Sequence, residues 1–243
     1  MPPEDRHQLL SALRETIQRI ERRPARRGGV VPSGLPRLDA ALPAGGFPRG
    51  ALSELSGGQA SGKTVAALAV LAALPPDALF AWIDARGELY PPGAAARGVD
   101  LRRLLIVRPA PQARSAAPAP CARPPPSRGY APSERGIVSD ALWASEALLA
   151  SGAFAAVVLD VPLCAALRGW DGVARRLQAA AEKGGAVGLW LAEPGAAVRV
   201  PAAVRLTVGM EGGVLTARPE MGRGRGEGGG QAPGRRLGAG HAA

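Results

Sequence analysis

The stretch Gly57-Gly58-Gln59-Ala60-Ser61-Gly62-Lys63-Thr64 decides how this chain folds. It has the pattern G-x-x-x-x-G-K-[ST], in which glycines let main-chain N–H groups turn inward around phosphates and the lysine reaches the terminal ones. Lys63 is one of two lysines among 30 basic residues, and a compact ammonium fits beside phosphates where the broad arginine fork does not. Thr64 supplies a hydroxyl for Mg²⁺. The pattern predicts that these eight residues bind the phosphates of a nucleotide.

The sequence on both sides of the loop has the context that this motif requires. Residues 51–56 alternate apolar and polar, as a strand does. Residues 64–74 are rich in Ala, Leu and Val without internal Gly or Pro, which predicts a buried helix that Pro75-Pro76 ends. Strand, loop and helix in this order are typical of a phosphate-binding P-loop. The alternative is a glycine-rich loop without a ligand, in a chain that holds 33 glycines.

The remaining pattern predicts an α/β fold, with strands that alternate with helices along the chain. A mostly parallel, twisted sheet covered by helices on both faces follows from this alternation. Among the tryptophans, Trp82, Trp143 and Trp190 are expected in the core and Trp170 at the surface. The expected strands are 78–84, 104–107, 155–160, 187–192, 203–208 and an edge strand 214–218, and the expected helices are 91–98, 139–149 and 171–182.

Three segments lie outside this alternation. Residues 5–23 predict a helix with an apolar stripe, which must dock on its own domain or on another subunit. Residues 109–136 are rich in Pro, Ala, Ser and Arg, which favours a disordered or polyproline segment. The tail 219–243 is rich in Gly and Arg and is predicted to be disordered. The domain prediction is an N-terminal helix and linker over 1–32, a core over 33–218 and this tail.

A carboxylate should lie across from the phosphate loop. Asp160 ends the apolar run 155–160, which predicts a central strand, and central parallel strands end near the ligand crevice. Its carboxylate is expected to hold Mg²⁺, usually through water, together with Thr64. Asp84 also ends a predicted strand and is the second choice for this role. The alternative for Asp160 is that its side chain caps a loop.

Composition narrows the class of protein. The net charge of +10 favours a polyanionic partner such as DNA, although a general bias towards arginine would produce the same excess. Arg223, Arg225, Arg235 and Arg236 of the tail are candidate DNA contacts. No apolar run is long enough to span a membrane, and no apolar stretch typical of a signal peptide follows the N-terminus. We expect a cytoplasmic protein, with association with the nucleoid as one option.

The chain resembles the ATPase core of the RecA recombinase family, and the resemblance covers most of residues 5–218. It implies a RecA-like P-loop core that uses ATP and Mg²⁺, and a helix 5–23 similar to the arm by which RecA protomers pack onto a neighbour. The similar stretches are Ser33-Gly34-Leu35, Leu38-Asp39-Ala40-Ala41-Leu42, Gly45-Gly46-Phe47-Pro48-Arg49-Gly50, the loop 57–64, Phe80-Ala81-Trp82-Ile83-Asp84-Ala85, Gly98-Val99-Asp100-Leu101, 142–160 and Ala203-Val204-Arg205-Leu206.

Departures from the family pattern bear on catalysis. Where the family has the glutamate that activates the attacking water, this chain has Arg86, which accepts no proton at neutral pH. Glu88 is a candidate substitute. Where the family has a glutamine that senses the γ-phosphate, this chain has Glu193, whose carboxylate would repel a phosphate. Tyr90 matches a loop that stacks on adenine in the family, and the alternative for it is local packing. The family's DNA-binding loop is shortened to about 194–200.

This pattern of losses is similar to the ImuA (SulA-like) accessory proteins of mutagenic translesion synthesis. The resemblance implies an ATP-binding accessory protein of DNA repair and the SOS response, with slow or absent hydrolysis, and with a RecA-type recombinase, a translesion polymerase or DNA as partner. A second hypothesis is an active DNA-dependent ATPase that forms filaments on single-stranded DNA. A third is a nucleotide-gated regulatory protein without DNA contact.

Overall fold

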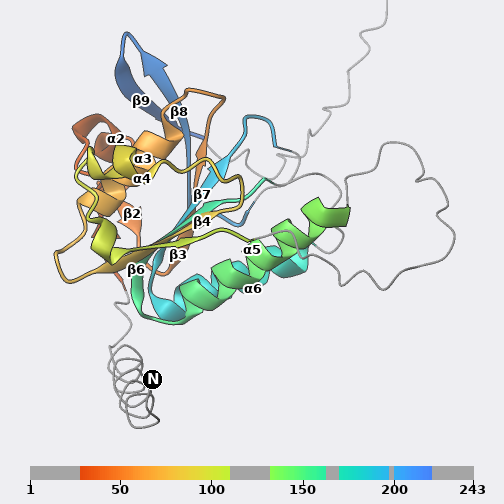
Figure 1. Ribbon diagram of the computed structural model, residues 1–243. Helices are drawn as coiled ribbons and strands as arrows, with labels where there is room; N and C mark the ends of the chain where they lie inside the picture. Colours follow the sequence, from red (N-terminus) through yellow and green to blue (C-terminus); the bar gives the residue numbers. More distant parts are fainter. Residues whose placement is uncertain (1–27, 110–131, 163–169, 197–199, 221–243) are drawn as a thin grey trace, which may run out of the picture.

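The computed structural model describes residues 28–109, 132–162, 170–196 and 200–220, which Figure 1 shows in colour. The elements in chain order are β1 (Val30–Val31), α2 (Pro36–Ala40), β2 (Phe47–Pro48), β3 (Ala51–Ser56), α3 (Lys63–Ala72), β4 (Leu79–Asp84), α4 (Pro91–Ala95), the 3-10 turn η1 (Leu101–Arg103), β5 (Leu104–Val107), α5 (Pro132–Ala150), β6 (Phe154–Asp160), α6 (Trp170–Gly184), β7 (Val187–Ala192), β8 (Val204–Glu211) and β9 (Val214–Pro219).

The predicted α/β fold with a mostly parallel sheet is confirmed. Seven strands of the described residues form one sheet in the order β5-β4-β6-β7-β3-β8-β9. All neighbouring pairs run parallel except β8 and β9, which form an antiparallel hairpin at one edge. The phosphate loop therefore follows an internal strand of the sheet, β3, which pairs with β7 on one side and β8 on the other. The carboxyl ends of β3, β6 and β7 point to the same edge of the sheet.

Helices cover both faces of the sheet, as the alternation of strands and helices predicts. Figure 1 shows α5 and α6 side by side on one face, with α2, α3 and α4 on the other. Each face has its own apolar cluster: Phe80, Trp82 and Val158 pack on the α3 side, and Ile83 and Leu159 on the α5 side. Side chains of a strand alternate between faces, so Asp160 shares the α3 side with Val158.

The start of α5 and the surroundings of two tryptophans differ from the sequence predictions. Helix α5 begins at Pro132, inside the segment 109–136 that was predicted to lack regular structure. Proline is tolerated in a first helical turn, where its missing N–H has no helical partner. Trp143 lies on the outer side of α5 with 73% exposure, so its expected place in the core is wrong. Trp170 is half-buried, with its ring 5.7 Å from that of Trp190 in an edge-on contact.

Several predictions fall outside the described residues. These are the helix 5–23, most of the segment 109–136 and the tail from Met221 onward, with its candidate DNA-binding arginines. Pro219 is the last residue of strand β9, and Glu220 directly follows it as the last described residue. Within the coloured part of Figure 1, no helix is long and apolar enough to cross a membrane.

The contact between the ends of α5 and α6 generates a prediction. A Cβ built on Gly184 comes 1.9 Å from the main-chain oxygen of Leu149, which belongs to buried backbone. We expect Gly184→Ala to cost about 1–3 kcal/mol by overpacking, and to lower the Tm by several degrees, as measured by thermal unfolding.

A matched control lies in the same helix. No atom of the described residues lies within 4 Å of a Cβ built on Gly172, so Gly172→Ala should be neutral or stabilising by up to about 1 kcal/mol. Equal melting temperatures for the two variants would contradict the close packing of α5 on α6.

Candidate phosphate-binding site

The loop between β3 and α3 needs glycine at two of its motif positions. A Cβ on Gly57 would lie 2.3 Å from the hydroxyl of Ser61 and 2.8 Å from the main-chain oxygen of Val208. Gly62 has a φ of 87°, and a Cβ there would lie 2.5 Å from the Leu215 side chain. Gly58, in contrast, has open space around it. Glycine is therefore required at positions 57 and 62, because the tight turn of the loop and the adjacent β8–β9 hairpin leave no space for a Cβ.

The loop leads directly into the first turn of α3. Gly62 precedes the helix, and the N–H of Ala66 donates to its carbonyl oxygen as the first helical bond. The first N–H groups of a helix have no helical partner and carry the positive end of the helix dipole. Residues 57–64 therefore present main-chain donors and a partial positive charge at one place, which is the arrangement that binds phosphate.

A cavity of about 540 Å³ opens beside this loop, at the carboxyl edge of the sheet. Its size is in the range of small-ligand pockets. Predicted site residues from four segments of the sequence meet in it. The lining residues are Gly58, Gln59, Ala60, Ser61, Gly62, Lys63, Thr64, Val65, Arg86, Glu88, Asp160, Glu193 and Met210.

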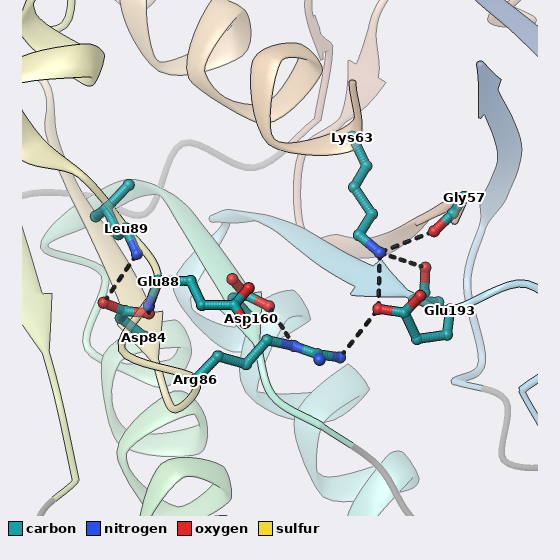
Figure 2. A network of polar contacts seen from close by, with 9 residues as sticks. Gly57, Lys63, Asp84, Arg86, Glu88, Leu89, Asp160 and Glu193 are labelled. Carbon is teal, nitrogen blue, oxygen red and sulfur yellow. Dashed lines mark hydrogen bonds and ion pairs between the residues drawn. The ribbon is translucent and has the colours of Figure 1, made fainter. Parts of the chain in front are cut away.

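Four charged side chains of the cavity form one continuous chain of ion pairs, drawn in Figure 2. Lys63 Nζ donates to Glu193 Oε1 at 2.9 Å and to the Gly57 carbonyl at 2.8 Å. The same Glu193 oxygen lies 3.3 Å from Arg86 Nη2. Arg86 Nε donates to Asp160 Oδ1 at 3.0 Å. The order of charges is therefore ammonium, carboxylate, guanidinium, carboxylate.

Asp160 and Asp84 end adjacent strands in register but have different surroundings. Asp84 is buried and bonded to Arg108 Nε at 2.7 Å and to the N–H groups of Glu88 and Leu89. Its oxygens are committed to holding the turn after β4, and its side chain does not line the cavity. Asp160 does line the cavity, so the geometry favours Asp160 over Asp84 for the role opposite the loop.

Burial raises the pKa of Asp160 from its ordinary value of 3.8 to about 6; Arg86 and Lys63 oppose this rise, and Asp84 and Glu88 add to it. The pKa in the folded state is above the ordinary value. Asp160 therefore stabilises the fold most below about pH 4, and this contribution is lost as the pH rises through about 6. An ionised Asp160 needs a cation beside it, and Arg86 is the cation that the chain itself supplies.

The donor types around the cavity fit a magnesium ion. Thr64 contributes a hydroxyl and Asp160 a carboxylate, and Mg²⁺ prefers oxygen ligands with several retained waters. Arg86 already occupies one oxygen of Asp160. A metal would therefore share this carboxylate with the guanidinium. Among the described residues, no group of three or more His, Cys, Asp or Glu side chains forms a separate metal site.

The remaining residues that the sequence suggested for the site lie at the cavity wall, outside the cavity or outside the described residues. Glu88 lines the cavity, as expected of a group near the phosphates. Tyr90 stands before α4 with 70% exposure and does not line this cavity. Arg223, Arg225, Arg235 and Arg236 lie outside the described residues.

Sequence reasoning missed two features of the site. It treated Arg86 as the loss of a base, whereas Arg86 links two carboxylates from different strands. It also gave no role to Met210, which lines the cavity from β8. The alternation within β8 was a signal that some side chains of this strand would face the loop, but the strand order needed to see it is not apparent in the sequence.

Comparison with known proteins supports a RecA-like core for part of the chain. Residues 13–116 match the family described as the RecA N-terminal domain. The RecA protein of Salinispora arenicola (strain CNS-205) is 42% identical over 95 residues, which are 39% of this chain and 27% of that protein. RecA of Streptococcus pyogenes serotype M49 (strain NZ131) is 42% identical over 94 residues, 38% of this chain and 25% of that protein.

A third relative extends the same picture. RecA of Symbiobacterium thermophilum (strain DSM 24528 / JCM 14929 / IAM 14863 / T) is 44% identical over 81 residues, 33% of this chain and 23% of that protein. The chain spans about a quarter of the length of these curated relatives. Asp160 and Glu193 lie beyond the family match, so their place in the site rests on geometry. Residues 13–116, which carry the phosphate loop and Arg86, are RecA-like in sequence.

Proposed function

We propose that this chain is an ATP-binding, RecA-like accessory protein of DNA repair that hydrolyses ATP slowly or not at all. The observation that carries the proposal is the single cavity in which the loop 57–64, Lys63 and Asp160 meet, on a chain whose residues 13–116 are similar to RecA. The SOS response and translesion synthesis are the processes that the pattern of losses favours.

The binding step uses the chain's own donors. Main-chain N–H groups of the loop cradle the inner phosphates, and the Lys63 ammonium reaches the outer ones. Thr64 and Asp160 are the residues that would hold Mg²⁺, which when bound neutralises phosphate charge. Lys63 is poised for this role because its side chain is 13% exposed and points into the cavity (Figure 2).

The hydrolytic step lacks an evident base. Water attack on a phosphate needs a group that accepts or orients a proton, and Arg86 does neither because it stays protonated. Asp160 is bonded to Arg86. Glu88 is the remaining carboxylate on the cavity wall that is not drawn into the chain of ion pairs, so it is the candidate base for whatever slow turnover occurs.

DNA and a protein partner complete the proposal. The net charge of +10 favours contact with DNA, for which the arginines of the tail are candidates. A RecA-type recombinase or a translesion polymerase is the proposed protein partner. The segment 5–23, for which the sequence predicts a helix, is the proposed self-association element. The proposed location is the cytoplasm, with association with the nucleoid as one option. The alternative is an active DNA-dependent recombinase, which the 42% identity to RecA favours and Arg86 disfavours.

Replacing Lys63 tests nucleotide binding. We expect Lys63→Ala to weaken ATP binding by about tenfold or more, since a charge-assisted contact to phosphate contributes about 1.5–3 kcal/mol. Isothermal titration calorimetry measures this. The other lysine, Lys183, lies in the last turn of α6 and provides the control. Lys183→Ala should bind ATP like the wild type, and equal affinity of Lys63→Ala and wild type would mean that the loop is not the nucleotide site.

Turnover distinguishes the accessory protein from the recombinase. We expect the rate of phosphate release from ATP to be close to the background rate of Lys63→Ala. Single-stranded DNA should raise this rate less than about twofold, because no base is positioned to activate the attacking water. Phosphate release is measured with and without DNA at saturating ATP. A strong stimulation by DNA that Lys63→Ala abolishes would support the recombinase instead.

The buried carboxyl predicts a pH dependence of metal-assisted binding. A protonated carboxyl binds Mg²⁺ poorly, and burial raises the pKa of Asp160 to about 6. The affinity for Mg-ATP should therefore fall as the pH is lowered from 7.5 to 5, approaching about tenfold per pH unit below the pKa. Asp160→Asn should bind weakly throughout and lose this dependence. A wild-type affinity that stays constant over this range would rule out Asp160 as the metal-binding group.

A further inference from the structure

One carboxylate oxygen lies between the two cations of the cavity. Glu193 Oε1 is 2.9 Å from Lys63 Nζ and 3.3 Å from Arg86 Nη2 (Figure 2). The lysine of this motif reaches the β- and γ-phosphates, and arginine forks bind phosphate oxygens. An anionic oxygen held by both cations is therefore where an oxygen of a terminal phosphate would be placed.

The backbone sets Glu193 at this position. Ala192 ends β7 opposite Ser56 of β3, and the N–H of Gly57 donates to the Ala192 carbonyl at 3.2 Å. The residue after Ala192 therefore starts beside the first residue of the phosphate loop. Side chains alternate along β7, with Leu191 on the α3 side, which aims Glu193 towards the loop and Lys63.

Arg86 keeps the carboxylate in place. Its Nε is bonded to Asp160 and its Nη2 faces Glu193, so the guanidinium is fixed at one end and holds Glu193 at the other. Asp160 is nearly buried at the end of β6, whereas 48% of the Glu193 side chain is exposed. The anchored end is thus rigid, and Glu193 is the member of the chain that can be displaced.

These contacts should give nucleoside diphosphates and triphosphates different affinities for the site. The main-chain donors of residues 57–62 serve the two inner phosphates. The Lys63 ammonium has three N–H donors, so it can reach the second phosphate while it stays paired with Glu193. A third phosphate needs the position between Lys63 and Arg86 that Glu193 Oε1 occupies, so it must move this carboxylate away from both cations. Before any ligand binds, the two cations are already balanced by Glu193 and Asp160.

Resting on the proposed nucleotide site, we propose that Glu193 stands in for the terminal phosphate and makes the site selective for a nucleoside diphosphate over the triphosphate. Glu193 is thus a specificity-determining residue, and Arg86 is a positioning residue that acts through it. ATP binds to this site when Glu193 has swung out of the cavity.

Calorimetric titration of the full chain with ADP and with ATP, at the same Mg²⁺ concentration and pH 7.5, tests the inference. We expect wild type to bind ADP about tenfold more tightly than ATP, since ATP must break two partly exposed ion pairs. Glu193→Gln and Glu193→Ala should both tighten ATP binding, leave ADP binding nearly unchanged, and bring the ratio close to one.

A matched control variant distinguishes the loss of the Glu193 ion pairs from the loss of one negative charge anywhere on the protein. Glu182 lies on α6 near Gly50, which precedes β3 at the opposite end of the sheet. Glu182→Gln removes the same charge and should keep the wild-type ratio. Equal binding of ADP and ATP by wild type, or a ratio unchanged in both Glu193 variants, would overturn this inference and leave the proposed nucleotide site intact. Binding of neither nucleotide by wild type and both variants would overturn the two together.

Discussion

The parallel alignment of β3, β6 and β7 is the constraint on which the site depends. Parallel strands end at one edge of a sheet, so residues 103 and 136 positions apart in the chain, such as Gly57 with Asp160 and Gly57 with Glu193, are brought to the same cavity. Buried apolar clusters on both faces hold the strands in this register. The chemistry of the site is a consequence of that register.

Carboxylates of the protein itself balance the two cations of the cavity. Lys63 and Arg86 face Glu193 and Asp160 in alternating order. Removing one member of such a chain would leave a partner without its counter-ion, which is costly for a buried group such as Asp160. In the proposed function, a phosphate ligand would therefore have to replace Glu193 as the partner of these cations. Arg86 links Asp160 to Glu193, so the cavity holds an anion that the chain itself supplies.

Much of the fold was predictable because local pattern and tertiary packing agree. Strands β5 and β7 were predicted to the residue, since each is an apolar run bounded by clear breaks. The start of α5 was missed because Pro and Arg near Pro132 conceal a helix that is fixed by packing further along. Trp143 was misplaced because a helix with a weak apolar pattern does not reveal which side faces the sheet.

The residues of the candidate site were predictable from the sequence, but the ion pairs that connect them were not. The loop and Asp160 follow from motif and strand pattern, and both line the cavity. The ion pairs of Arg86 depend on the register of β4 against β6, where Asp84 lies opposite Asp160. The paired residues of β4 and β6 are 75 or more positions apart in the chain, and their register is set by the whole sheet, so no local pattern contains it.

A crystal structure of the full chain with bound ADP is the decisive measurement of how this cavity holds phosphate. We expect the two phosphates to lie against the main-chain N–H groups of residues 57–64, with the Glu193 carboxylate still between Lys63 and Arg86. A nucleotide bound elsewhere on the molecule, or a phosphate bound in the cavity away from this loop, would contradict it.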